Sequence, residues 1–250
     1  MKLDVVFTPL GLAPLDVAGR TVLVVDVLRA TTTICAALHH GARAVVVAAD
    51  IEDATRLAHT LDTRDVLLAG ERHSLRIPGF QLGNSPEEVT VEAVAGKTLV
   101  MTTTNGTKAL LATAGAREVI VASAVNLSSA SASAAAALAA DGELLILCAG
   151  RDQGFGMDDA YLAGRLAIGA LGGRPTRAGL NDAALVAVDL VRHYGDGIER
   201  VLALSHAGRD LAALGLQADV SAAARVDAHP VVPRYHDRRI TLPDVGRGRV

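Results

Sequence analysis

The sequence predicts an α/β fold in which a mostly parallel β-sheet carries helices on both faces. Three observations support this class. Short runs rich in Val, Ile and Leu recur between residues 21 and 148, and each is followed by a stretch of helix-like composition. The run at 21–28 is almost continuously apolar, as expected for a parallel strand that is covered on both faces. Regular alternation of strands and helices predicts right-handed crossovers within one sheet.

The first strand–helix unit joins the strand at 21–28 to a helix at 29–40. This helix opens on three threonines and stops at Gly41, a residue type that is common just past a helix C-terminus. The remaining units have the same form, and residues 2–7 add a further expected strand. We expect the other strands at 44–48, 66–69, 98–102, 119–122 and 143–148, and the other helices at 51–61, about 107–113, about 127–140 and 158–171.

The tail of the chain has a different pattern. Helix-like stretches precede an extended segment that contains Pro230 and Pro233. No linker-like composition separates the tail, so we expect a C-terminal helical cap on the same domain, with one α/β domain over residues 1–250, its core over about 1–175 and the cap over about 176–250. The expected helices of the tail are 183–194, 198–204 and 205–214.

The composition excludes several classes of function. The 250 residues are half hydrophobic and one-fifth charged, which is typical of a chain that buries a sizeable core. Three Phe, three Tyr and no Trp leave few platforms on which nucleic-acid bases can stack. A net charge of -3 without a basic run argues against binding to a phosphate backbone. No apolar stretch approaches the length of a membrane span. We therefore expect neither nucleic acid nor membrane as a partner.

The cysteines and the N-terminus favour a cytoplasmic location. Cys35 and Cys148 lie in separate apolar segments, a spacing that forms neither a disulfide framework nor a zinc site. The chain begins Met-Lys-Leu-Asp, and no apolar run of a secretory signal follows. Arg151 follows Cys148 too soon for the Cys-x₅-Arg loop of thiol phosphatases, so a buried strand residue is the expected role of Cys148.

Several familiar functional motifs are absent. Gly96-Lys97-Thr98 lacks the earlier glycine of a phosphate-binding P-loop, because position 91 is valine. Residues 154–159 end in Asp where a dinucleotide fingerprint requires Gly. The eight histidines form no metal-spaced pair. We expect His39 and His40 to be solvated at a helix end, whereas His73 and His206 are less easily dismissed as residues without a function.

Charged and hydroxyl side chains gather where the predicted strands end. In open α/β sheets, ligands bind beyond the carboxyl ends of the strands. Because acids, arginines and hydroxyls recur along this one edge, we expect a site for a small anionic substrate there. The strand ends carry Asp26, Arg29 and Thr31, then Glu71 and Arg72, then residues 102–107, then Ser123 and Asn126, and finally residues 148–152 with Asp158 and Asp159.

Asp26 follows four apolar residues, and a carboxylate near a buried strand end is costly unless it is paired, hydrogen-bonded or bound to metal. One interpretation is an ion pair with Arg29 or an N-cap for the next helix. The other is a metal ligand or nucleophile, which we favour because Glu71 and Asp159 end neighbouring strands. Carboxylates with water suit Mg²⁺, which binds few protein ligands and leaves room for substrate oxygens. Asp159 has an alternative role as a first-turn acid of its helix.

Two loop segments add candidate contacts to an anion. Residues 70–88 are polar, with three Gly and two Pro, and long loops inside compact domains are usually functional or disordered. The mixture of Glu71, Arg72, Asn84 and Ser85 there favours function. Residues 104–107, Thr-Asn-Gly-Thr, form a strand-to-helix junction whose glycine allows close approach and whose helix N-terminus suits an anion. On this motif alone, an ordinary N-cap is the favoured interpretation.

Several blocks of sequence, taken together and in order, carry a resemblance to a known family. They are residues 24–33 (VVDVLRATTT), 69–72 (AGER) with 79–86 (GFQLGNSP), 103–107 (TTNGT), 148–150 (CAG) with 158–164 (DDAYLAG), and parts of 205–233. Over nearly the whole chain, the set resembles the 2-phosphosulfolactate phosphatase family. One departure is Asp158-Asp159-Ala160, where the family usually has Glu-Asp-Ala.

The resemblance implies hydrolysis of the phosphate ester of (R)-2-phospho-3-sulfolactate to sulfolactate and inorganic phosphate, with Mg²⁺ as cofactor. In methanogens this reaction serves coenzyme M biosynthesis. We assign Asp26, Glu71 and Asp159 to the metal and Asp26 with Arg29 to catalysis. Whether Asp26 attacks phosphorus or only binds metal stays open. The assigned substrate contacts are Arg29, Thr31, Arg72, Asn84, Ser85, Thr104, Asn105, Gly106 and Arg151.

Two alternatives remain at this point. The same scaffold would also suit a phosphatase of another small phosphorylated hydroxy acid, or a non-catalytic protein that binds a small anion. The clustered carboxylates argue against pure anion binding. Ala-rich helices and a packed sheet make us expect a homodimer.

Overall fold

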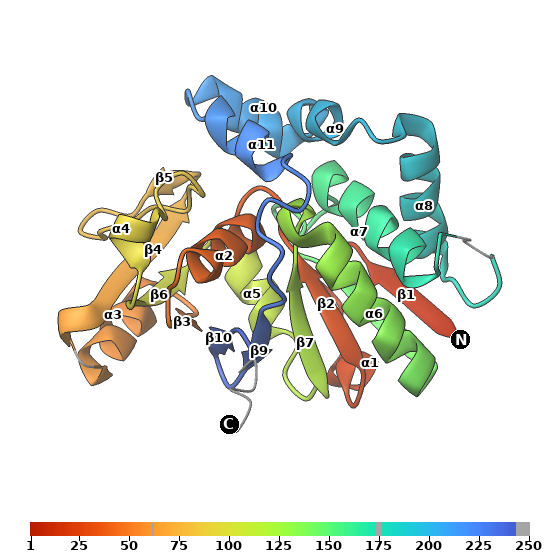
Figure 1. Ribbon diagram of the computed structural model, residues 1–250, viewed down its shortest axis with the longest axis horizontal. Helices are drawn as coiled ribbons and strands as arrows, with labels where there is room; N and C mark the ends of the chain where they lie inside the picture. The colour runs from red at the N-terminus through yellow and green to blue at the C-terminus, as the bar shows by residue number, and fades with distance from the viewer. Residues whose placement is uncertain (62, 174–176, 244–250) are drawn as a thin grey trace, which may run out of the picture.

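The computed structural model describes residues 1–61, 63–173 and 177–243. Within them the strands are β1 (Lys2–Val6), β2 (Thr21–Val25), β3 (Ala44–Val47), β4 (Val66–Arg72), β5 (Leu75–Arg76), β6 (Thr98–Thr102), β7 (Glu118–Ala122), β8 (Glu143–Cys148), β9 (Arg234–His236) and β10 (Arg239–Thr241). They form one sheet in the order β1-β8-β2-β7-β9-β10-β3-β6-β4-β5 (Figure 1). The pairs β1–β8, β2–β8, β2–β7, β3–β6 and β4–β6 are parallel, which confirms the predicted fold class.

Every predicted helix is present, with short additions. The helices are α1 (Pro14–Val17), α2 (Ala30–His39), α3 (Ile51–Thr60), α4 (Val91–Val94), α5 (Gly106–Leu111), α6 (Leu127–Asp141), α7 (Met157–Ala170), α8 (Asp182–Tyr194), α9 (Ile198–Leu204), α10 (His206–Ala213) and α11 (Gln217–Ala223), with 3₁₀ turns at Thr63–Asp65 and Ala124–Asn126. Helices α1, α4 and α11 were not expected from the sequence.

Strand β2 is buried on both faces, which explains its continuous apolar run. Val22 and Val24 join a hydrophobic cluster with residues of α2 and α5, while Leu23 and Val25 join another with residues of α6 and α7. All four side chains are inaccessible to solvent. Because alternate residues of a strand face opposite sides of a sheet, helices must cover both faces here.

The tail contributes to the sheet as well as to a cap. Strands β9 and β10 form an antiparallel hairpin that pairs with β7 on one side, at Ile120 and Arg234, and with β3 on the other, at Val45 and Ile240. The extended segment after Pro233 is therefore part of the sheet, where it fills the gap between two parallel groups of strands.

Helices α8 to α11 form the cap that the sequence predicts. Helix α8 packs on α7 and β1, while α9, α10 and α11 pack on one another (Figure 1). Leu202, Leu211 and Val220 of these helices join the hydrophobic cluster that contains Leu23 and Val25. In the part of the chain that the structure describes, no helix has the length and apolarity to cross a membrane.

The two parallel groups of strands are also bridged by helices. Helix α2 contacts both β7 and β3, and α5 contacts both β2 and β3. The N-termini of α2 and α5 follow the carboxyl ends of β2 and β6, so the fold brings the predicted strand-end residues to one edge.

Candidate active site

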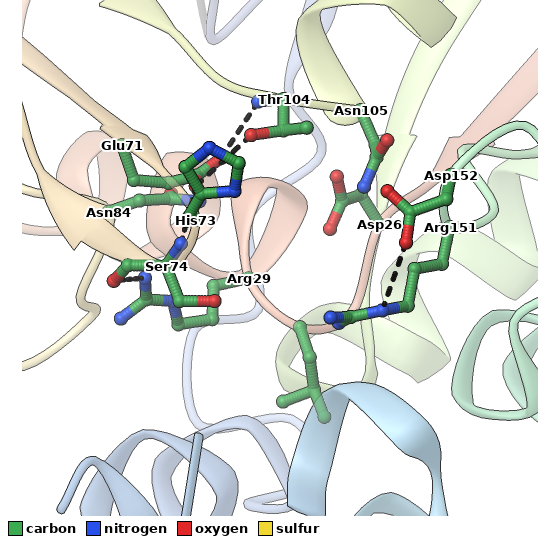
Figure 2. Close-up of a pocket in the computed structure, with 11 residues that line it drawn as sticks. Asp26, Arg29, Glu71, His73, Ser74, Asn84, Thr104, Asn105, Arg151 and Asp152 are labelled. Atoms are coloured by element: carbon green, nitrogen blue, oxygen red, sulfur yellow. Dashed lines mark hydrogen bonds and ion pairs between the residues drawn. The ribbon is translucent and has the colours of Figure 1, made fainter. Parts of the chain in front are cut away.

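A cavity of about 130 Å³ lies at this edge, between the two parallel groups of strands. Seven of the predicted site residues line it, and they come from both groups (Figure 2). The lining is formed by Asp26, Leu28, Arg29, Glu71, His73, Ser74, Asn84, Thr104, Asn105, Arg151 and Asp152. The structure thus brings together residues that are up to 126 positions apart, from Asp26 to Asp152, as the strand-end argument predicts.

Asp26 is one of two buried acids that line this cavity, with Glu71. The Asp26 residue is 7% exposed, and its Oδ1 accepts a hydrogen bond from the Ala30 N–H at 3.2 Å, in the first turn of α2. Thr31 does not line the cavity. Its hydroxyl donates to the Asp26 carbonyl oxygen at 2.8 Å and accepts from the Asp26 N–H at 3.1 Å. The structure therefore places Thr31 behind Asp26, where it holds the main chain of that residue.

Gly106 lies against Asp26 on the other side. A Cβ added at Gly106 would be 2.5 Å from Asp26 Oδ2 and 2.5 Å from Ala30 Cβ, distances that real Cβ atoms do not show. Gly106 does not line the cavity itself. Its lack of a side chain allows the start of α5 to pack directly on the Asp26 carboxylate.

Asp26, Asp158 and Asp159 are buried close to one another, and burial dominates their electrostatics. Burial raises the pKa of Asp26 from 3.8 to about 7, with smaller increases from the charges of Asp158 and Glu71. Burial also raises the pKa of Asp158 to about 6. The pKa of Asp159 is raised well above its usual value by burial and by the nearby charges of Asp158 and Asp26. Such a group of acids favours a cation or a shared proton.

All three predicted metal ligands accept hydrogen bonds from main-chain N–H groups, and Asp159 and Glu71 each accept two. Asp159 Oδ1 accepts from Val27 at 2.9 Å and Oδ2 accepts from Gly150 at 3.1 Å, so this residue ties the ends of β2 and β8 together and does not line the cavity. Glu71 accepts from the N–H groups of Thr104 at 2.7 Å and Ser74 at 2.9 Å.

The three predicted metal ligands do not form one compact ligand set. Among the described residues, the oxygens of Asp26, Glu71 and Asp159 do not all lie within 4.8 Å of one another. The donor chemistry of the cavity nevertheless fits a hard cation such as Mg²⁺, which prefers oxygen ligands. Asn84 Oδ1 is buried and has no hydrogen-bond partner within the described part of the chain. It lines the cavity together with the Asp26 carboxylate.

Arg29 is anchored by the cap. Its Nη1 lies 2.5 Å from Oδ2 of Asp219 in α11, and its Nη2 donates to the Ser74 carbonyl oxygen at 2.6 Å. Ser85 donates to the other carboxylate oxygen of Asp219 at 2.6 Å and does not line the cavity. Asp219 was missed as a site residue, because an acid in a short tail helix carries no local signal of a role in the site.

Arg151 supplies a second cation. It forms ion pairs with Asp210 in α10 and, at 3.6 Å from Nε, with Asp152. In Figure 2, Arg29 lies to the lower left of Asp26 and the guanidinium of Arg151 lies below it. Two guanidinium groups in one small polar cavity suit a ligand with more than one anionic group.

The hairpin turn after β4 supplies residues that the sequence analysis did not assign to the site. His73 and Ser74 line the cavity and have φ values of 52° and 66°, the left-handed region of a two-residue turn. Asp152 occupies an equivalent position in a second turn, with a φ of 48°. Arg72, in contrast, lies outside the cavity, where it donates to the Glu71 carbonyl oxygen at 2.7 Å and to Thr102 at 3.1 Å.

Comparisons with known proteins identify the family of the chain. A family model described as 2-phosphosulpholactate phosphatase matches residues 7–238. Three bacterial proteins, each named probable 2-phosphosulfolactate phosphatase, are similar to the chain. That of Symbiobacterium thermophilum is 38% identical over 91% of this chain and 96% of its own length. That of Deinococcus radiodurans is 44% identical over 84% of this chain and 85% of its own length. That of Thermus thermophilus is 45% identical over 87% of this chain and 88% of its own length. The chain therefore belongs to the 2-phosphosulpholactate phosphatase family.

Proposed function

We propose that the protein is a Mg²⁺-dependent phosphatase that hydrolyses 2-phosphosulfolactate to sulfolactate and inorganic phosphate. Its family is one of phosphatases, so the chain is a phosphoric monoester hydrolase. The observation that carries the proposal is the buried carboxylate of Asp26 in a small polar cavity that also contains Arg29 and Arg151. The names of the relatives support the choice of substrate.

The charges of the cavity match the charges of this substrate. It carries a phosphate, a sulfonate and a carboxylate, and each needs cationic or hydrogen-bonding partners. Arg29 and Arg151 offer guanidinium groups, while Thr104 and Asn105 add a hydroxyl and an amide on the lining. Because Asp219 and Asp210 hold the two arginines, their orientation is set before the substrate binds.

Asp26 and Asn84 are the residues that would hold Mg²⁺, with Asp158 close enough to act on Asp26 electrostatically. A bound Mg²⁺ would neutralise charge on the transferring phosphoryl group. The roles of Glu71 and Asp159 are then supporting ones. Glu71 holds the loops at Ser74 and Thr104, and Asp159 holds the strand ends beside Asp26.

The test is the release of inorganic phosphate from 2-phosphosulfolactate, with Mg²⁺ and with a chelator, for the wild type and for Asp26→Asn. We expect activity only in the wild type with Mg²⁺. Asp189→Asn, which changes an exposed acid of α8, is the matched control and should retain full activity. Full activity of Asp26→Asn, or activity that survives the chelator, would contradict the proposal.

Two further measurements refine the assignment. A panel of phosphorylated hydroxy acids tests the substrate, since a strong preference for a non-sulfonated ester such as phospholactate would contradict the sulfonated one. An acid-quenched single turnover with a radiolabelled phosphoryl group tests the role of Asp26. Label on the protein in the wild type alone would indicate attack by Asp26 on phosphorus, whereas unlabelled protein would favour metal binding.

A further inference from the structure

Three histidines meet at the far end of α2, outside the active cavity. His39 and His40 end the helix, and His229 lies in the segment between α11 and β9. The ring centroids are 5.5 Å apart for His39 and His40, 4.9 Å for His39 and His229, and 5.2 Å for His40 and His229. One ring nitrogen of each lies within 4.8 Å of those of the other two. His39 and His40 were expected to be solvated at a helix end, but both also contact the ring of His229.

The hydrogen bonds leave nitrogen lone pairs available in this cluster. His40 Nδ1 lies 2.5 Å from the carbonyl oxygen of Val89, which requires a proton on Nδ1 and leaves the lone pair on Nε2. A ring nitrogen that donates to a main-chain carbonyl is the usual arrangement behind a histidine that binds metal. His229 Nδ1 is buried and has no hydrogen-bond partner among the described residues. A buried nitrogen of this kind is costly unless something binds it.

The surroundings keep His229 in the form that binds metal. Burial, together with the nearby charges of His39, His40 and Arg225, lowers its pKa from 6.5 to about 4, so the ring is neutral at neutral pH. The positive charge of Arg225 is balanced by Glu87, at 3.3 Å. His40 and His229 also border a cavity of about 360 Å³ that Glu92 helps to line, which leaves room for a water molecule beside the rings.

We propose that His39, His40 and His229 form a binding site for a transition-metal cation of the Zn²⁺ type, with a fourth position open to water. Three neutral imidazoles select Zn²⁺, Ni²⁺ or Cu²⁺ over Mg²⁺, which prefers oxygen. Zn–N bonds of about 2.0–2.1 Å require the nitrogens to be about 3.3 Å apart. The nitrogens lie within 4.8 Å of one another, and rotation of the exposed His39 side chain would bring its nitrogen closer to the other two.

This site differs from the active cavity in both chemistry and consequence. It would join the C-terminal end of α2 to the segment after α11. Arg29 precedes the N-terminus of the same α2 and pairs with Asp219 in α11, so the metal and the ion pair would connect the same two parts of the chain. Its expected role is structural, because none of the three histidines lines the active cavity. A ligand that binds only the folded state raises the stability of that state.

The test uses untagged protein that has been treated with a chelator and then freed of it. Titration with Co²⁺ should give the intense visible absorption of four-coordinate cobalt, which should saturate at one Co²⁺ per protein. Zn²⁺ should displace the bound Co²⁺ and remove this absorption. Zn²⁺ should also raise the melting temperature when Mg²⁺ is already present in excess. We expect His229→Gln and His39→Gln to remove both effects. His59→Gln changes an exposed histidine on α3, and both it and Asp26→Asn should retain them.

His39→Gln keeps the proposal testable even if His229→Gln misfolds, because the side chain of His39 is exposed. Circular dichroism verifies the fold of each variant. The proposal is overturned if the wild type shows no four-coordinate cobalt spectrum. It is also overturned if folded His39→Gln binds Co²⁺ with unchanged affinity and spectrum, or if Asp26→Asn alone abolishes the signal.

Discussion

The guanidinium of Arg29 and the carboxylate of Asp219 form a buried ion pair, with Nη1 2.5 Å from Oδ2, although 190 positions of the chain separate them. Their side chains are only 4% and 3% exposed. The same carboxylate accepts the hydroxyl of Ser85. One acid of the cap therefore sets the position of an active-site arginine and of the loop that carries Asn84.

Removal of this charge tests the relationship. Asp219→Asn leaves Arg29 buried without a counter-charge, so the free energy of unfolding should fall by about 3–5 kcal/mol, and kcat/KM should fall as well. Urea denaturation and phosphatase assays measure the two effects. The control is Asp189→Asn, which breaks an exposed pair with Arg192 and should cost less than about 1 kcal/mol. Equal losses in the two variants would contradict the importance of burial.

Stability of the Mg²⁺-free protein should depend on pH through Asp26. Burial raises its pKa from 3.8 to about 7, so the folded state binds more protons than the unfolded state between these values. Its contribution is fully present below about pH 4 and is lost as the pH rises through 7, a decrease on the order of 4 kcal/mol. Urea midpoints between pH 5 and 8 should therefore decline, and Asp26→Asn should flatten the decline. A profile that is the same in both proteins would rule out Asp26 as its cause.

Gly106→Ala tests the close packing on Asp26. The added methyl would meet Asp26 Oδ2 and Ala30 Cβ at 2.5 Å, so α5 or the carboxylate must shift. We expect a loss of about 1–3 kcal/mol in stability and a clear loss of kcat/KM. Gly197→Ala is a control on the exposed surface, where the nearest atom to an added methyl is 3.2 Å away. Wild-type kinetics in Gly106→Ala would show that this packing does not position Asp26.

Ser74 tests whether a residue on the cavity wall acts through its main chain. Its N–H donates to Glu71 and its carbonyl oxygen accepts from Arg29, while its φ is 66°. Ser74→Gly keeps both contacts and suits this φ, so activity should remain and stability should rise by up to about 1 kcal/mol. Ser74→Val should lower both, because β-branched residues avoid positive φ. Lost activity in a stable Ser74→Gly would assign the hydroxyl to the substrate.

Much of the fold could be predicted from local pattern alone. Strands such as β2 are buried on both faces, so their composition indicates their position in a parallel sheet. The β9–β10 hairpin could not be predicted in this way. Its turn residues, Asp237 and Arg238, have φ values of 45° and 65° but lack the glycine that usually indicates such a turn. The place of the hairpin between β7 and β3 depends on tertiary pairing that periodicity does not contain.

The sequence predicts those residues of the candidate site whose position follows from the ends of the strands. Asp26, Glu71 and Asn105 lie at or after strand ends, and parallel strands bring such ends to one edge. Residues that line the cavity could not be separated by sequence from those that support it, such as Thr31 and Asp159. That distinction depends on which atoms each side chain meets, and it appears only once the main-chain hydrogen bonds are known.

The position of the β9–β10 hairpin in the sheet affects how the chain folds during synthesis. Until residues 234–241 leave the ribosome, β7 and β3 both expose unpaired main-chain groups along one edge. N-terminal parts of a chain generally fold first, so the two groups of parallel strands would lack their shared partner strands until the hairpin has been synthesised. A nascent chain that still lacks this hairpin is exposed to edge-to-edge pairing with other chains. Chaperone binding to stalled nascent chains should therefore end once this hairpin has emerged.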